Sequence, residues 1–122
     1  MKEVMLKRTR KFAIDSWILC SKLPKSREYN AYVNQLIRCS SSVGANYRAS
    51  QRAKSAADFI NKLKIVEEEA DESQYFLELL FDITIIEKID LQQDIEILKK
   101  EANEIIAIIV SSIKTARINN AK

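Results

Sequence analysis

The chain has 122 residues, of which 47% are hydrophobic and 30% are charged, and its formal net charge is +3. This length predicts a single domain, residues 1–122, with a modest core, and no apolar run is long enough to span a membrane. The sequence contains one glycine and one proline, too few turn-forming residues for a β-rich fold, so we expect long helices.

Two helices are expected in the first half of the chain, at about residues 3–22 and 26–52. Apolar residues recur at helical spacing through the first helix, and Pro24 ends it because proline cannot continue an α-helix. Ser26 is placed to cap the second helix. The second helix carries apolar residues on one side and small residues that allow a neighbouring helix to approach closely.

The second half of the chain predicts helices at about residues 56–88 and 91–117, and we expect the residues after 117 to fray. Ser55 is placed to cap the third helix, whose apolar residues step by four and three as in a coiled coil. Asp90 and Gln93 have the spacing of a capping box before the fourth helix. The sequence therefore predicts an all-α fold, an antiparallel up-and-down four-helix bundle.

Short motifs spread over nearly the whole chain resemble a known family. They are Arg38, the run Ser42 to Arg48, Lys54 and Ser55 leading to Ala57, Asp58 and Phe59, Glu101 to Asn103, and Ile113 to Ala116. The family is that of the proteins encoded in intervening sequences of bacterial 23S ribosomal RNA genes, and the chain is also similar to the accessory variability protein of diversity-generating retroelements. This resemblance implies a homopentamer and, through the retroelement relative, binding to nucleic acid and to a protein partner such as a reverse transcriptase.

The apolar residues exceed what one core-facing stripe requires, which predicts contacts between subunits. Second stripes run along the third and fourth helices, and small residues form a patch on the second helix. A lone small bundle would expose these stripes, so we expect a homo-oligomer. The candidate interface residues are Ser40, Gly44, Phe76, Leu79, Ile83, Ile86, Ile106 and Ile113.

The charge is divided unevenly along the chain. Residues 1–64 hold 14 Lys or Arg and 4 Asp or Glu, a net +10, whereas residues 65–122 hold 6 and 13, a net −7. On the second helix, Arg38, Arg48 and Arg52 fall on one side without an intervening acid. The candidate nucleic-acid-binding residues are Arg38, Arg48, Arg52, Lys54, Arg10 and Lys11, within a wider basic surface that also includes Lys2, Lys7 and Arg8.

Two interpretations of this basic face stay open. In one, the cations contact nucleic-acid phosphates, and oligomer symmetry repeats them into a basic belt. In the other, the arginines pair with the acidic run at residues 67–72, within a subunit or between subunits, and the oligomer is a scaffold or adaptor for a protein partner. Binding that weakens steeply with salt would indicate the first interpretation.

Catalysis is not expected, because the sequence has no histidine, the usual general base and the usual metal ligand. We therefore predict no cofactor and no metal site. Cys20 and Cys39 are expected to be buried, reduced residues and not a disulfide. The N-terminal basic segment lacks the apolar stretch of a signal peptide, which predicts a cytoplasmic location without membrane association.

Overall fold

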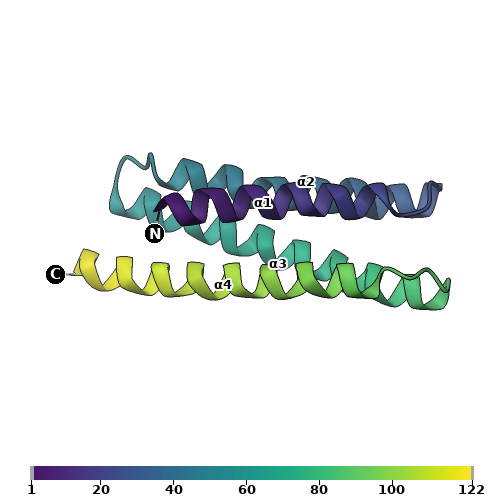
Figure 1. Cartoon of the computed structure of the whole chain (residues 1–122). Coiled ribbons are helices and arrows are strands. Elements are labelled where there is room, and N and C mark those ends of the chain that lie inside the picture. Colours follow the sequence, from purple (N-terminus) through teal and green to yellow (C-terminus); the bar gives the residue numbers. More distant parts are fainter. Residues whose placement is uncertain (1, 122) are drawn as a thin grey trace.

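The computed structural model describes residues 2–121, and the regular structure in this part of the chain consists of four α-helices (Figure 1). They are α1 (Lys2–Ser21), α2 (Arg27–Ser50), α3 (Ala56–Ile86) and α4 (Gln92–Ala121). The all-α prediction is confirmed, and most helix ends lie within two residues of their predicted positions. The exception is the end of α4, which continues to Ala121 because neither glycine nor proline follows to interrupt it.

The four helices lie along one another, with their connections at alternate ends and the two termini at the same end (Figure 1). Each helix packs against the next one in sequence, whereas α1 and α4 meet more sparsely. Residue pairs fix the register: Tyr29 of α2 bonds Glu87 just after α3, and Arg38 of α2 bonds Glu69 of α3.

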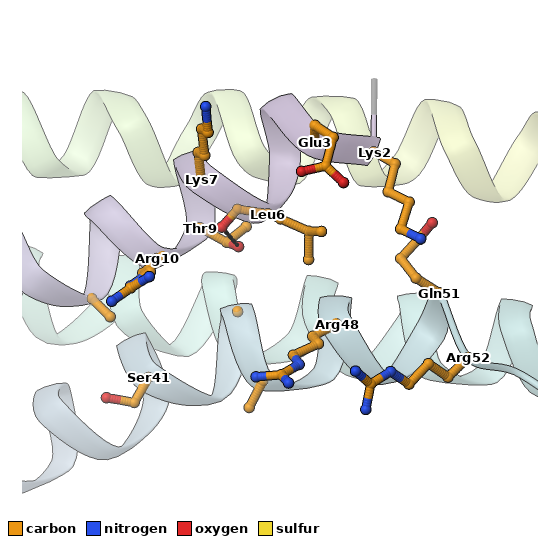
Figure 2. A pocket seen from close by; sticks show the side chains of 13 residues that line it. Lys2, Glu3, Leu6, Lys7, Thr9, Arg10, Ser41, Arg48, Gln51 and Arg52 are labelled. Carbon is orange, nitrogen blue, oxygen red and sulfur yellow. Dashed lines mark hydrogen bonds between the residues drawn. The ribbon is translucent and has the colours of Figure 1, made fainter.

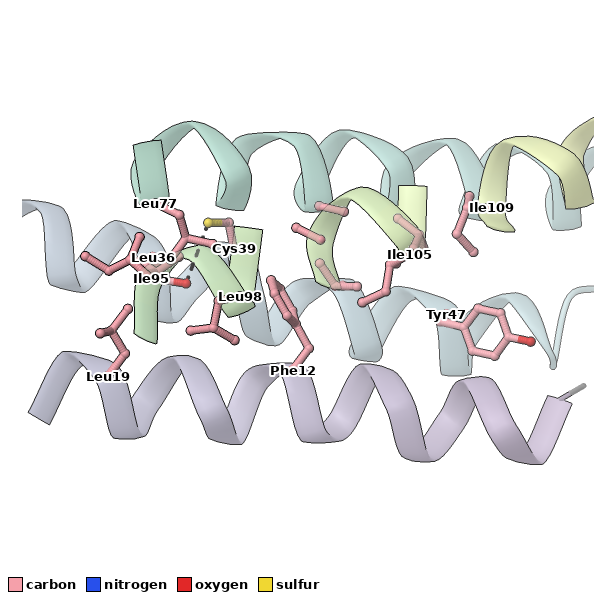
Figure 3. Packing of buried hydrophobic residues seen from close by; sticks show 14 of the residues in the cluster. Phe12, Leu19, Leu36, Cys39, Tyr47, Leu77, Ile95, Leu98, Ile105 and Ile109 are labelled. Atoms are coloured by element: carbon pink, nitrogen blue, oxygen red, sulfur yellow. Dashed lines mark hydrogen bonds between the residues drawn. The ribbon is translucent and has the colours of Figure 1, made fainter. Parts of the chain in front are cut away.

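The core is built from one stripe of each helix. Phe12 of α1, Leu36 of α2, Leu77 of α3 and Ile105 of α4 are all at most 1% exposed (Figure 3). The heptad spacing of α3 predicts this burial, and every stripe residue from Leu63 to Thr84 is buried. Burial of each large aliphatic side chain contributes about 1.5 to 3 kcal/mol before the entropy of ordering is counted.

Two of the three expected helix caps are present. The Ser26 hydroxyl accepts the Tyr29 N–H at 3.1 Å, and the Ser55 hydroxyl accepts the Asp58 N–H at 3.0 Å. The predicted cap at Asp90 is wrong, because α4 begins at Gln92 and the Gln92 side chain instead donates to the Ile89 carbonyl at 2.7 Å.

The end of α3 forms a tight stop without glycine. Lys88 adopts φ 57°, in the left-handed region, its N–H donates to the Ile85 carbonyl at 3.1 Å, and the Ile89 N–H donates to the Thr84 carbonyl at 2.9 Å. These two bonds define a Schellman motif, whose left-handed position favours glycine. The motif satisfies two carbonyl groups at the end of α3, and α4 begins four residues after Lys88.

We expect Lys88→Gly to raise the free energy of unfolding by up to about 1 kcal/mol. Glycine removes the strain of a left-handed side chain, partly offset by its greater freedom in the unfolded chain. Urea unfolding would measure the change. Lys114→Gly, at an exposed position inside α4, is the matched control and should lower stability by about 1 kcal/mol; a Lys88→Gly variant that loses stability like the control would contradict the prediction.

Cys20 and Cys39 are free and buried, as predicted. Burial raises the pKa of the Cys20 thiol to about 11, aided by Cys39 and opposed by Lys25. Burial also raises the pKa of Tyr29 to about 12, and its hydroxyl donates to the Glu87 carboxylate at 2.7 Å. Both groups are therefore held in the neutral form.

Alkali should destabilise the fold through these groups. The pKa of the Cys20 thiol is higher in the folded chain than in the unfolded chain, where it is near 9. The stability that the neutral thiol contributes is therefore complete below pH 9 and is lost as the pH rises through 11. The expected loss attributable to Cys20 is on the order of 2 kcal/mol. Urea unfolding at pH 8 and at pH 11 would measure it, and an equal loss in Cys20→Ala would contradict the assignment.

Candidate nucleic-acid interface

A groove of about 580 Å³ runs between α1 and α2 (Figure 2). The lining positions span residues 2–13 of α1, which at 1.5 Å per residue gives a length of about 16 Å, and residues 41–52, which comprise the end of α2 and the turn after it. We call this feature the α1–α2 groove. Its lining residues are Lys2, Glu3, Leu6, Lys7, Thr9, Arg10 and Ala13 of α1, Ser41, Gly44, Ala45 and Arg48 of α2, and Gln51 and Arg52 in the turn directly after α2.

A close approach of the two helices forms the floor of the groove. A Cβ atom added to Gly44 would lie 3.2 Å from the Thr9 Oγ1 and 3.5 Å from the Thr9 carbonyl carbon. The Thr9 hydroxyl is fixed by donating to the Met5 carbonyl at 2.8 Å. A Cβ atom at this position would thus make a contact slightly shorter than usual, and a larger side chain would not fit. The small neighbours Ala13 and Ala45 leave the space above the contact open.

Cations lie on both sides of the groove. Lys2, Lys7 and Arg10 come from α1, Arg48 comes from α2, Arg52 comes from the turn directly after α2, and all five are exposed. Within residues 2–121, none of the five has a carboxylate partner within 4 Å. We call these residues the groove cations. The lining includes one carboxylate, Glu3, so the groove has a strong excess of positive charge.

The structure brings together three of the six predicted nucleic-acid-binding residues, namely Arg10, Arg48 and Arg52. The separation of Arg48 and Arg52 by four residues corresponds to a rise of about 6 Å along α2. Lys2 and Lys7 were predicted only as part of the wider basic surface, although their spacing places them on the same face of α1 as Arg10. The decisive information is that this face of α1 lies opposite Gly44, which no local pattern specifies.

Arg38 lies at the other seam of α2, toward α3. Its guanidinium donates to Glu69 at 3.3 Å and also to Glu72, and the hydrogen bond to Glu72 together with both charges raises its pKa. For Arg38 the structure therefore supports pairing within the subunit. Arg38 does not line the groove, because its side chain turns toward the acidic residues of α3.

The remaining predicted cations also lie outside the groove. Lys11 pairs with Asp15 one turn along α1, and Lys54 lies in the loop after α2, where its backbone N–H donates to Asp58 at 3.1 Å. Arg8, from the wider basic surface, binds Glu101 at 2.7 Å and also contacts Glu104. The two contacts of Arg8 join the basic half of the chain to its acidic half.

The residues proposed for subunit contacts occupy different environments. Ser40 and Ile113 are buried inside this chain, and Gly44 packs on Thr9, so these three have their contacts within the subunit. Ile86 is 77% exposed and offers an apolar surface. The other four are partly buried: Phe76, Leu79, Ile83 and Ile106.

Several other apolar side chains, outside the predicted interface residues, are also exposed. Trp17 is 60% exposed on α1, Tyr75 and Ile85 are 56% and 52% exposed on α3, and Ile97 is 57% exposed on α4.

Residues 2–121 contain no cluster of three or more His, Cys, Asp or Glu side chains placed to hold a metal ion. None of the four helices is long and apolar enough to cross a membrane.

Comparison with known proteins identifies the family. The family model described as 23S rRNA-intervening sequence protein matches residues 2–111, which include both sides of the groove. The chain belongs to this family. No curated protein matches the sequence.

A solved structure has the same fold. It is a protein of unknown function from the S23 ribosomal protein family of Bacteroides thetaiotaomicron, 33% identical to this chain, with a TM-score of 0.79. The similarity covers 93% of this chain and 99% of the other. The resemblance expected from the sequence motifs is thus confirmed at the level of family and fold.

Proposed function

We propose that this protein is a non-catalytic nucleic-acid-binding protein that holds phosphate groups in the α1–α2 groove. The observation that carries the proposal is the set of five groove cations, exposed on both sides of one groove with a single carboxylate among them. Cations gathered without counter-charges repel one another, and a phosphate backbone would relieve that repulsion while releasing its own counterions.

The chemistry of the groove suits phosphate contacts more than recognition of bases. Arginine can bind a phosphate through two parallel N–H donors, and lysine adds a mobile point charge. The neutral polar side chains in the lining are Thr9, Ser41 and Gln51, and the Thr9 hydroxyl is already bonded to the Met5 carbonyl. We therefore expect affinity without strong sequence preference.

The proposal includes assembly. In this view antiparallel up-and-down bundles associate through the exposed apolar side chains of α3 and α4 as a cytoplasmic homo-oligomer, a homopentamer by family resemblance, so that the groove recurs around the assembly. Light scattering would test this, and a mass near one 14.0 kDa chain would contradict it.

Salt dependence tests the binding proposal directly. Fluorescence anisotropy with labelled oligonucleotides should give a logarithmic affinity that falls linearly with the logarithm of the salt concentration. The slope should be about −0.7 per phosphate neutralised on a single strand, or about −0.9 per phosphate on duplex DNA. Absence of binding, or binding insensitive to salt, would reject the proposal.

A scaffold for a protein partner is the second candidate function. The observation that favours it is the exposed apolar end of α3, where Ile85 is 52% and Ile86 is 77% exposed. Exposed apolar residues of this size are typical of protein contacts. If Ile86→Glu abolishes oligomer formation while the parent protein binds no nucleic acid, the scaffold function is the better description.

A further inference from the structure

The shape of the α1–α2 groove restricts which nucleic acid can enter it. The axes of packed helices lie about 8 to 10 Å apart, and α1 and α2 approach closely at Gly44 and Thr9. A groove between two such helices admits one sugar-phosphate backbone, whereas a duplex is too wide to reach the floor. A single strand lying in the groove would meet cations from α1 on one side and from α2 on the other (Figure 2).

An exposed tryptophan extends the same face of α1. The residues of α1 that line the groove include Leu6, Arg10 and Ala13, and Trp17 follows Ala13 by one helical turn on that face. Trp17 is 60% exposed, so the faces of its indole ring are accessible to a ligand. Its indole ring is therefore available at the end of the groove.

Phosphate contacts and an aromatic ring together form the usual arrangement for binding single strands. A basic groove follows the backbone, while unpaired bases stack on aromatic side chains, and stacking tolerates any base because every base has a π-face. In a duplex the bases are already stacked and paired, so the ring has nothing to bind. An exposed tryptophan beside cations that are already paired with carboxylates would not form such a site.

We infer that the α1–α2 groove and Trp17 form a binding site for single-stranded nucleic acid, with the backbone held by the groove cations and a base stacked on Trp17. This inference rests on the proposed function, and it adds the strand type and the stacking residue. The site discriminates single strands from duplex by width and by stacking, and not by base identity.

The only tryptophan in the sequence provides the test. Oligothymidylate should quench the Trp17 fluorescence at saturation and should bind about tenfold more tightly than the same strand annealed to oligoadenylate. Trp17→Ala should weaken oligothymidylate binding by about tenfold without changing the salt slope, because stacking releases no counterions. Trp17→Phe should retain most of the affinity, since it keeps an aromatic face.

A second variant tests entry into the groove without changing charge. Ala45→Leu fills the floor and should weaken binding of the single strand, whereas Ala31→Leu, at an exposed position of α2 outside the groove, should not. Equal affinity of the parent protein for the single strand and the duplex would overturn the inference. So would a parent protein whose Trp17 fluorescence does not change on binding, together with a Trp17→Ala variant that keeps full affinity. Either result would leave phosphate binding intact. Loss of all salt-sensitive binding in the parent protein would instead reject the proposed function.

Discussion

Replacing Arg48 and Arg52 together with alanine should weaken nucleic-acid binding by about a hundredfold at low salt and make the salt slope shallower by about one unit per lost contact. Both guanidinium groups line the α1–α2 groove, are exposed, and have no carboxylate partner within the described residues. Their removal therefore takes away two of the five groove cations without exposing a buried charge. Binding isotherms at several salt concentrations would measure both quantities, and unrelated sequences should be affected alike.

The matched control is the double variant Arg27→Ala with Arg38→Ala. It removes the same charge from the same helix, but Arg27 bonds Glu28 and Arg38 bonds Glu69 and Glu72, away from the groove. The control should retain most of the affinity. Glu3→Gln, which removes the carboxylate from the groove, should strengthen binding.

Two outcomes would contradict this prediction. Equal losses in both double variants would mean that net charge alone attracts the nucleic acid. If Arg48→Ala with Arg52→Ala dissociates the oligomer while the parent protein shows no salt-sensitive binding, the two arginines pair with acids of a neighbouring copy.

The features predicted correctly from the sequence depend on local physics. The caps at Ser26 and Ser55 involve atoms three residues apart, so the spacing alone is sufficient. The heptad spacing repeats along α3, and its stripe from Leu63 to Thr84 is buried as the spacing predicts. The cap at Asp90 was predicted wrongly because α4 begins at Gln92, one residue later than the spacing from Asp90 to Gln93 indicates.

The candidate site was predicted only in part because a helical projection shows one helix without its neighbours. Arg38, Arg48 and Arg52 share an arc of about 80° on α2. In the bundle, α1 borders one side of that arc and α3 borders the other. Arg38 therefore reaches Glu72, whereas Arg48 and Arg52 line the groove beside α1.

The same limitation affects Gly44. Its small size correctly predicts a close helix contact, but the sequence does not specify whether the partner belongs to the same chain or to a second copy. The structure places Thr9 of α1 at that contact. A substitution at Gly44 should therefore disturb the subunit itself before it disturbs any assembly.

Gly44→Leu should lower the free energy of unfolding by about 3 kcal/mol and abolish the nucleic-acid affinity of the groove. A Cβ atom would lie 3.2 Å from the Thr9 Oγ1, and the rest of the leucine side chain has no space between the helices, so α1 must move away from α2. Gly44→Ala should be nearly neutral, because the gain in helix propensity offsets the short contact. Ala45→Leu, the adjacent exposed position, should retain stability.

A double-mutant cycle with Thr9→Ala identifies the contact responsible. Thr9→Ala removes the hydroxyl that the new side chain would meet, so it should recover part of the stability lost in Gly44→Leu. Urea unfolding of the four proteins gives the coupling energy, which should be on the order of 1 kcal/mol. If the two changes are simply additive, or if Gly44→Leu is as stable as the parent and only changes the oligomer, Gly44 belongs to a subunit interface. The α1–α2 groove would then not depend on the contact between Gly44 and Thr9.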